Sequence, residues 1–108
     1  MKLSDIQDFA WHPDTGATDH MTGNVGNLLS LTPYTGNDGV MVGNGDILPI
    51  THIGKATVGS GDSSVPLNDV LLVPDIKKNF LSISKLTSDY PLKFEFNGLG
   101  FVIKDRIT

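Results

Sequence analysis

An acid, a hydroxyl, a glycine and a small residue follow one another at Asp14, Thr15, Gly16 and Ala17. Pro13 fixes the backbone angle φ just before the acid. The Thr15 hydroxyl can bond backbone groups and lock a loop, and Gly16 allows a tight turn and the close approach of another backbone. Such a loop can hold a carboxylate rigidly beside a second copy of itself. An ordinary turn with a solvated aspartate also fits the four residues, and only the rest of the chain can separate these two interpretations.

A pair of carboxylates would supply general acid–base chemistry. Asp14 and Asp19 of one chain could share a proton, but the flexible Gly16 between them gives no reason for close contact. Two copies of Asp14 are a better arrangement, because a two-fold dimer places the same loop opposite itself. Two like charges a few ångströms apart cannot both ionise cheaply, so one proton is shared. One carboxylate would then act as general base on a water, while the protonated one hydrogen-bonds a peptide carbonyl.

Three other chemistries are less well supported by the residues. The possible metal ligands among the histidines are His12, His20 and His52, and none has the spacing of a zinc site, so we expect surface or turn residues and no metal. Serine hydrolysis is not supported, because the chain has no Gly-x-Ser-x-Gly motif. Ser60 and Ser63 lie in a stretch typical of a flexible loop. Phosphate binding lacks the glycine, lysine and helix that should follow residues 43–45.

Composition limits the class of protein. A chain of 108 residues fits a single domain over residues 1–108, and 39% apolar and 19% charged residues indicate a globular fold. A net charge of −4 does not suggest a nucleic-acid surface, and the absence of cysteine excludes disulfides. No apolar run approaches the roughly 20 residues of a membrane span. The abrupt start and the end within a pattern suggest a piece cut from a longer polyprotein.

Short apolar runs alternate with Gly, Asn, Asp and Pro along the whole chain, which predicts an all-β sandwich or barrel. Strands are predicted at residues 6–11, 28–31, 51–58 with a bulge at Gly54, 70–73, 92–96 and 101–103. The run at 70–73 is continuously apolar, so this strand should be buried on both faces. One short helix is predicted at residues 80–88.

The clearest local signal is a hairpin at residues 40–50. Apolar residues flank Asn44 and Gly45, the pair favoured by a type I′ turn because both of its central residues need positive φ. Pro49 indicates an edge position on the returning strand. Gly43 and Gly45 make the hairpin supple, and a supple, projecting hairpin is a candidate lid. A plain structural hairpin fits the same residues.

Four segments together resemble a known family, in order and over nearly the whole chain. They are residues 11–22 (WHPDTGATDHMT), 42–50 (VGNGDILPI) followed by Ile53 and Gly54, 67–86 (LNDVLLVPDIKKNFLSISKL) and 101–105 (FVIKD). These segments are similar to the retropepsin-like aspartic protease of copia-type LTR retrotransposon Gag-Pol polyproteins.

The resemblance implies a homodimeric, closed or partly open β-barrel that cleaves its own polyprotein, with a flap at about residues 39–52 and no cofactor. By position, Asp14 would be the catalytic acid and Thr15 would brace the two loops across the dimer, with Gly16 and Ala17 bordering the substrate. Backbone amides at the flap tip, Val42, Gly43, Asn44 and Gly45, would orient substrate carbonyls and help exclude water. An extended peptide would pair with strand edges. The resemblance places the protein in cytoplasmic virus-like particles, with neither nucleic acid nor membrane as a direct partner.

The chain departs from the viral retropepsin pattern at two places. Thr18 stands where viral enzymes have a second acid, and residues 81–84 stand where they have a Gly-Arg pair. In the viral family these groups tie the active-site loop to the dimer interface, so we expect a weak dimer stabilised by substrate or by flanking polyprotein. Two other hypotheses stay open: a non-catalytic, domesticated module that keeps the fold and binds peptide or dimerises, and a structural β-domain of a capsid-like protein.

Overall fold

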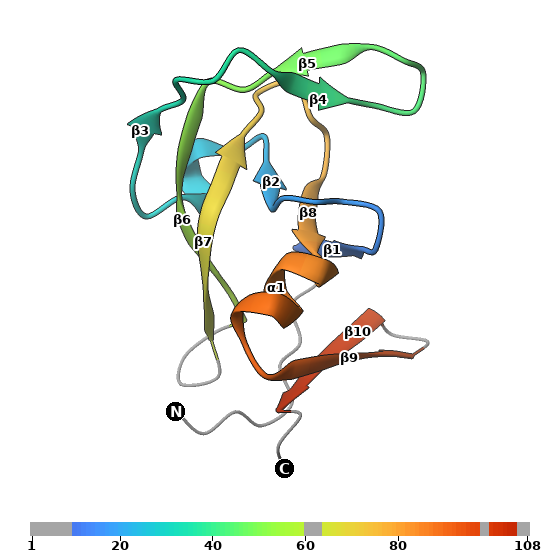
Figure 1. The fold of residues 1–108 in the computed structure, drawn as a ribbon. Coiled ribbons are helices and arrows are strands. Elements are labelled where there is room, and N and C mark those ends of the chain that lie inside the picture. The colour runs from blue at the N-terminus through green and yellow to red at the C-terminus, as the bar shows by residue number, and fades with distance from the viewer. Residues whose placement is uncertain (1–9, 60–63, 98–99, 106–108) are drawn as a thin grey trace.

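A computed structural model describes residues 10–59, 64–97 and 100–105, and its strands form one six-stranded sheet and two hairpins (Figure 1). The strands of the large sheet, in spatial order, are β1 (Trp11–Asp14), β8 (Asn79–Ser82), β2 (Met21–Thr22), β7 (Val65–Leu72), β6 (His52–Val58) and β3 (Thr32–Pro33). The hairpins are β4 (Gly39–Met41) with β5 (Ile47–Pro49), and β9 (Leu92–Asn97) with β10 (Gly100–Asp105). The chain is therefore an all-β, barrel-like domain with one α-helix among the described residues, α1 (Ile83–Asp89).

Strands distant in sequence meet in the large sheet. β1 pairs in parallel with β8, from Trp11 opposite Asn79 to Asp14 opposite Ser82. β2 then joins the two halves of the sheet, antiparallel to β8 and parallel to β7. This order places the end of β1 next to the start of α1. The loop that follows β1, residues 14–20, lies there too and is called the acid loop.

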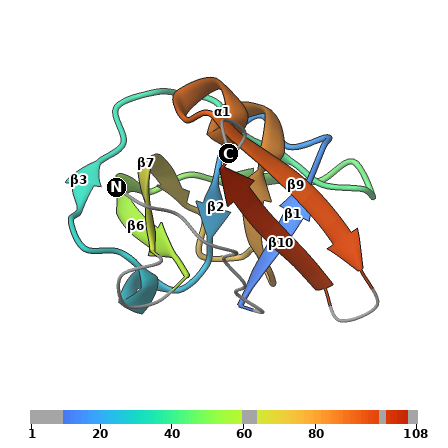
Figure 2. The same cartoon turned by 90° about the horizontal axis from the view of Figure 1, so that it is seen from below.

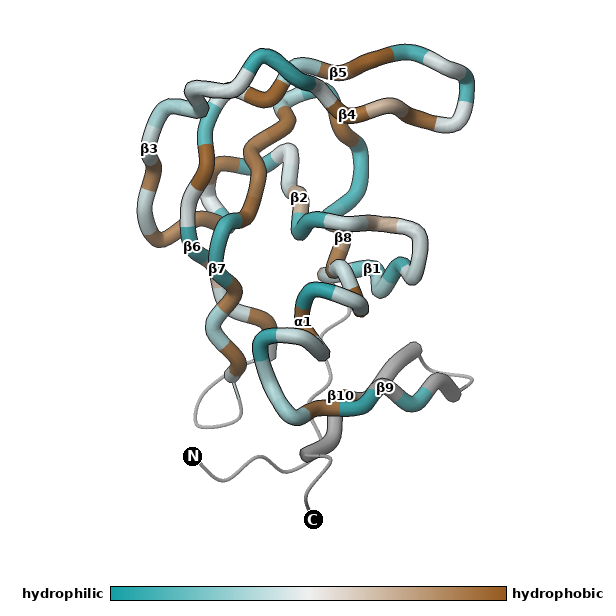
Figure 3. The backbone as a smooth tube through the Cα atoms, in the orientation of Figure 1, coloured by the Kyte–Doolittle hydropathy of each residue, from teal (hydrophilic) through white to brown (hydrophobic). Residues whose placement is uncertain are grey.

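The main core lies between the large sheet, α1 and the β9–β10 hairpin. Leu86 of α1, Leu92 of β9 and Ile103 of β10 are at most 1% exposed and share this cluster with Val65 and Leu67 of β7. Figure 2 is seen from the end of the molecule that carries the β9–β10 hairpin, and it shows α1 beside β9. Hydrophobic residues alternate with more hydrophilic ones along β6 and β7 in Figure 3, as expected for strands that pack one face on a core.

Several sequence predictions are confirmed. The chain forms the β4–β5 hairpin, and β6 shifts register between Gly54 and Ala56, where a bulge was expected. A side chain on Gly54 would collide with the Ser30 carbonyl, so the close approach of the two backbones requires glycine there. Residues 70–73 are buried throughout, and β9 and β10 pair as the alternating pattern indicated.

Other predictions were wrong in place or type. The predicted helix at 80–88 begins only at Ile83, because residues 79–82 form β8 against β1. No strand forms at 28–31; Leu29 and Leu31 are exposed, and the short β3 comes one residue later. The first strand begins at Trp11 within the described residues, and residues 6–9 of the predicted strand lie outside them.

No helix in the described ranges is long and apolar enough to cross a membrane.

The hairpin turn is not the predicted type I′ turn. Gly45 has φ +90° but Asn44 does not have positive φ. The Gly45 N–H donates to the Val42 carbonyl (2.9 Å), and the Val42 N–H donates to the Asp46 carbonyl (2.9 Å). The loop therefore contains three residues, Gly43 to Gly45, with the last in the left-handed conformation. A turn followed by one left-handed residue is the usual geometry of a three-residue hairpin loop.

Candidate active site

Asp14 ends β1, and its carboxylate is held by the loop that it starts. Asp14 Oδ1 accepts a hydrogen bond of 2.7 Å from the Gly16 backbone N–H. A Cβ on Gly16 would lie 3.3 Å from the same oxygen, which is tighter than most real contacts. The glycine therefore lets the loop close around the carboxylate. Asp14 itself is only half-buried, while Thr15 and Gly16 are exposed.

The far side of the acid loop is bound to the N-terminus of α1. The Ser82 hydroxyl donates to the Ala17 carbonyl (2.7 Å), and the Ser82 N–H donates to His20 Nδ1 (3.0 Å). Ser82 is also the N-cap of α1, since its Oγ accepts from the Lys85 N–H at 3.2 Å. The loop is therefore fixed at several points, whereas the exposed Thr15 is left to face outward.

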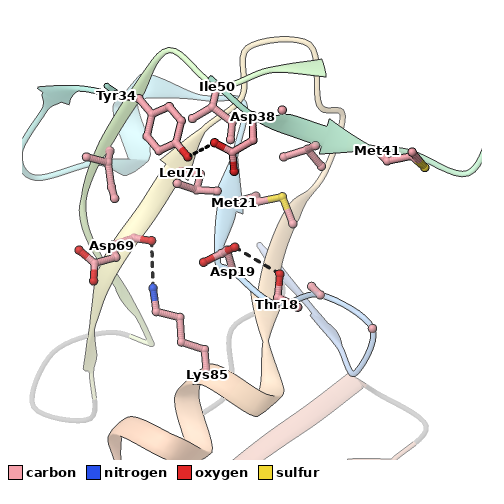
Figure 4. Close-up of a pocket in the computed structure, with 15 residues that line it drawn as sticks. Thr18, Asp19, Met21, Tyr34, Asp38, Met41, Ile50, Asp69, Leu71 and Lys85 are labelled. Carbon is pink, nitrogen blue, oxygen red and sulfur yellow. Dashed lines mark hydrogen bonds between the residues drawn. The ribbon is translucent and has the colours of Figure 1, made fainter. Parts of the chain in front are cut away.

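A groove of about 870 Å³ lies between the acid loop and the hairpin (Figure 4). Its walls come from Gly16–Asp19 of the loop, from residues 38–41 at the start of the hairpin, and from β6 and β7. A smaller hollow of about 270 Å³ adjoins it and is lined by Asp14, Gly16 and Ala17 together with residues 40–43. The carboxylate and the hairpin thus border one space that is large enough for peptide side chains.

The hairpin rests on the acid loop by one apolar pair. Val40 and Leu48 face each other across β4 and β5, are half-buried, and pack against a cluster that contains Ala17 and Met21. Two other apolar side chains of the hairpin are largely exposed, Met41 at 70% and Ile47 at 64%. The base of the hairpin is therefore anchored, while its outer part stays open to solvent or to a partner. Figure 3 shows both of its strands as largely hydrophobic.

Charged groups line the larger groove. The Tyr34 hydroxyl donates to Asp38 Oδ1 at 2.6 Å, and this bond raises the pKa of the Tyr34 phenol and lowers the pKa of the Asp38 carboxyl. Lys85 Nζ donates to the backbone carbonyls of Asn68 (2.9 Å) and Asp69 (3.0 Å). In Figure 4 Asp19 lies across the groove from Asp38, with Met21 between them. The groove therefore combines an apolar floor with polar and acidic edges.

The histidines do not form the surface set that was expected. His12 is exposed and His52 is half-buried, but His20 is fully buried, so its assignment as a surface or turn residue was wrong. Burial, and secondarily the charge of Lys85, lower the pKa of His20 to about 4. The imidazole is therefore neutral at ordinary pH. Among the described residues, no group of three His, Cys, Asp or Glu side chains is placed to hold a metal ion.

The sequence-predicted site residues are only partly brought together. Asp14, Gly16 and Ala17 share a hollow with Val42 and Gly43. Asn44 instead lines a different hollow, beside residues 75–78, and a side chain at Gly45 would meet open space. The sequence reasoning missed Ser82 and the burial of His20, because their contacts to the loop join positions 62 and 65 apart and leave no local pattern.

The fold and the site define an all-β domain with an acid loop beneath a hairpin, and comparison with known proteins gives the family. Residues 11–90 match the family model "Pol polyprotein, beta-barrel domain". The chain belongs to this family of retrotransposon Pol polyprotein domains.

Two curated relatives come from Arabidopsis thaliana. The chain is 42% identical over 98 residues to the retrovirus-related Pol polyprotein from transposon RE2, and 38% identical over 98 residues to the one from transposon RE1. Each alignment covers 91% of this chain but 7% of the relative, so the chain spans a small part of the polyproteins it matches. No solved structure matches it significantly. The predicted origin in a retrotransposon Pol polyprotein is confirmed.

Proposed function

We propose that this domain is an aspartic endopeptidase that processes a retrotransposon polyprotein, with Asp14 as its catalytic acid. The observation that carries the proposal is the position of the Asp14 carboxylate, which the Gly16 N–H fixes at a hollow shared with the tip of the β4–β5 hairpin. A carboxylate held in place beneath a hairpin that can cover a bound peptide suits general base catalysis.

The second carboxylate of the catalytic pair comes from a second copy of the chain. Asp14 is the only acid that lines its hollow in the described residues, while Asp19 lines the larger groove. A two-fold dimer that joins the exposed loops would place two Asp14 side chains together, and they would share one proton. The ionised carboxylate then removes a proton from water as it attacks the peptide carbon, and the protonated carboxylate donates to the carbonyl oxygen.

The other site residues take supporting parts. Thr15 is exposed, so its hydroxyl would bond the partner loop, and Gly16 and Ala17 would border the substrate, since both line the hollow with Asp14. The hairpin closes over an extended peptide, whose carbonyls meet the backbone amides near Val42 and Gly43. We propose a homodimer that is weak without substrate, acting in cytoplasmic virus-like particles, where the polyprotein is concentrated.

Incubation of the longer precursor tests this function. The parent precursor should be cut, and the Asp14→Asn precursor should lose cleavage by at least about 10²-fold, because its amide cannot act as a base. Asn keeps an oxygen that can accept from Gly16, so circular dichroism of the two proteins should agree. Cleavage by the Asp14→Asn precursor at the parent rate would rule out the mechanism.

A matched control separates chemistry from charge. Asp89→Asn removes an exposed carboxylate at the end of α1 and should leave the precursor cleaved, because Asp89 lines neither the groove nor the hollow with Asp14. If the parent folds and binds a statine-type transition-state peptide without cutting any precursor, the domain is the non-catalytic peptide-binding module instead.

A further inference from the structure

We propose that His20 and Ser82 form a positioning pair that sets the geometry of the acid loop and thereby the rate of peptide cleavage. This inference rests on the proposed function, and neither residue lines the groove or the hollow next to Asp14. The pair acts through the loop backbone and not on the substrate.

Ser82 contacts the loop at three points. It lies opposite Asp14 in the parallel pairing of β1 with β8. Its hydroxyl donates to the Ala17 carbonyl at 2.7 Å, and its N–H donates to His20 Nδ1 at 3.0 Å. The residues on both sides of the exposed turn are therefore held by one residue of the sheet, so a shift at Ser82 is passed to the carboxylate.

The hydroxyl of Ser82 is fully used. A serine hydroxyl has one hydrogen and two lone pairs. The hydrogen goes to Ala17, and the lone pairs face the Lys85 N–H (3.2 Å) and the Ser84 hydroxyl (3.2 Å). The Ser84 hydroxyl must then be the donor to Ser82. Because Ser82 also caps α1, the loop is joined directly to the start of the helix.

The buried imidazole of His20 supplies an acceptor that few side chains could supply. Since Nδ1 accepts from Ser82, the proton of the neutral ring is on Nε2, and Nε2 has no hydrogen-bond partner in the described structure. A buried donor without a partner is costly. An apolar residue would avoid that cost but would leave the Ser82 N–H without an acceptor. The histidine therefore gives the Ser82 N–H an acceptor, but leaves its own Nε2 donor without a partner in the described structure.

Four variants test the pair in the precursor or with a peptide cut from it. Ser82→Ala and His20→Leu each remove one contact to the loop, and they should lower kcat by about 10- to 100-fold with KM changed less than about threefold, because a small misplacement of a catalytic group costs this much. Ser82→Thr keeps the hydroxyl, and His20→Asn places an amide oxygen near the position of Nδ1. Both conservative variants should recover most of the parent kcat.

A core variant separates positioning from simple loss of stability. Leu86→Val weakens the packing of α1 but leaves the three contacts of Ser82 intact. At equal folded fraction, checked by urea unfolding, it should keep the parent kcat. Positioning is refuted if Leu86→Val loses as much kcat as Ser82→Ala, or if folded Ser82→Ala and His20→Leu cleave at the parent rate.

An NMR measurement keeps the inference separate from the proposed activity. The Gly16 amide proton reports its bond to Asp14, and its chemical shift should move in His20→Leu but stay near the parent value in His20→Asn. If the parent cleaves nothing, the proposed function fails, while this shift still decides whether the pair positions the loop. An unchanged Gly16 shift in both variants would refute the positioning role.

Discussion

Asp14 and Ser82 lie directly opposite each other in the parallel pairing of β1 with β8, although 68 positions separate them. Ser82 is also the residue that bonds Ala17 and caps α1. The sheet therefore positions Asp14, and Ser82 at the start of α1 positions the turn that follows Asp14. This relationship explains how an exposed loop can keep one geometry.

Gly16→Ala should disturb the carboxylate without unfolding the chain. The added Cβ would lie 3.3 Å from Asp14 Oδ1, so the carboxylate or the turn must move by a few tenths of an ångström. Kinetics on a precursor peptide should show kcat reduced by about 10-fold or more, for the same reason that small misplacements slow catalysis. A Gly16→Ala protein with the parent kcat would contradict the fixed geometry of the carboxylate.

The two glycines of the hairpin tip should respond differently to alanine. Gly45 has φ +90°, so Gly45→Ala should lower the free energy of unfolding by about 1–2 kcal/mol. Gly43 lacks positive φ, and a Cβ there would meet nothing within 4 Å, so Gly43→Ala serves as the matched control and should stay within about 0.5 kcal/mol. Urea unfolding measures both. Equal losses would contradict the three-residue loop.

The stability of the domain should fall with acid because of His20. Burial lowers its pKa from 6.5 to about 4, so between these values the unfolded chain binds a proton that the folded chain does not. The free energy of unfolding should therefore drop as pH falls through this window, by about 3 kcal/mol at 1.36 kcal/mol per pKa unit, and the loss due to His20 is complete below it.

Comparison with His20→Asn isolates this contribution from other titrating groups such as Asp38. Urea unfolding over pH 4–6.5 should give a shallower pH dependence in His20→Asn, while Leu86→Val, which weakens the core without removing a titrating group, should keep the parent slope. The interpretation is wrong if the parent and His20→Asn show the same slope.

The bond between Tyr34 and Asp38 should be visible in the titration of the phenol. The hydrogen bond to the Asp38 carboxylate raises the pKa of Tyr34 above its usual 10.0. In a Tyr90→Phe background, which leaves Tyr34 as the titrating tyrosine, Asp38→Asn should lower that pKa toward the usual value, as followed by ultraviolet absorbance. An unchanged pKa would mean that the bond at the base of the hairpin does not form in solution.

Local patterns in the sequence predicted most of the elements. The apolar run at 70–73 and the alternation at 92–96 gave the right strands, because the two-residue period of a strand and full burial of a strand both leave a direct record in the sequence. Asn44 and Gly45 gave the right hairpin but the wrong turn, since the choice between a two- and a three-residue loop depends on strand register. Here the bond between Val42 and Asp46 sets that register.

Contacts between distant segments were not predictable in the same way. The helix was expected from Phe80, but pairing of β8 with β1 holds residues 79–82 extended, and Ser82 starts the helix instead. The candidate acid came from the sequence because its neighbours Gly16 and Ala17 are local. The supports of that acid, His20 and Ser82, came only from the three-dimensional structure.

The proposed catalytic pair takes one Asp14 from each of two chains, and analytical ultracentrifugation during titration with a statine-type transition-state peptide shows whether two chains share one ligand. The ligand should drive two chains into a dimer with one ligand per two chains, and Asp14→Asn should abolish this response. One ligand bound to each monomer, or a single chain that persists with ligand in excess, would contradict it.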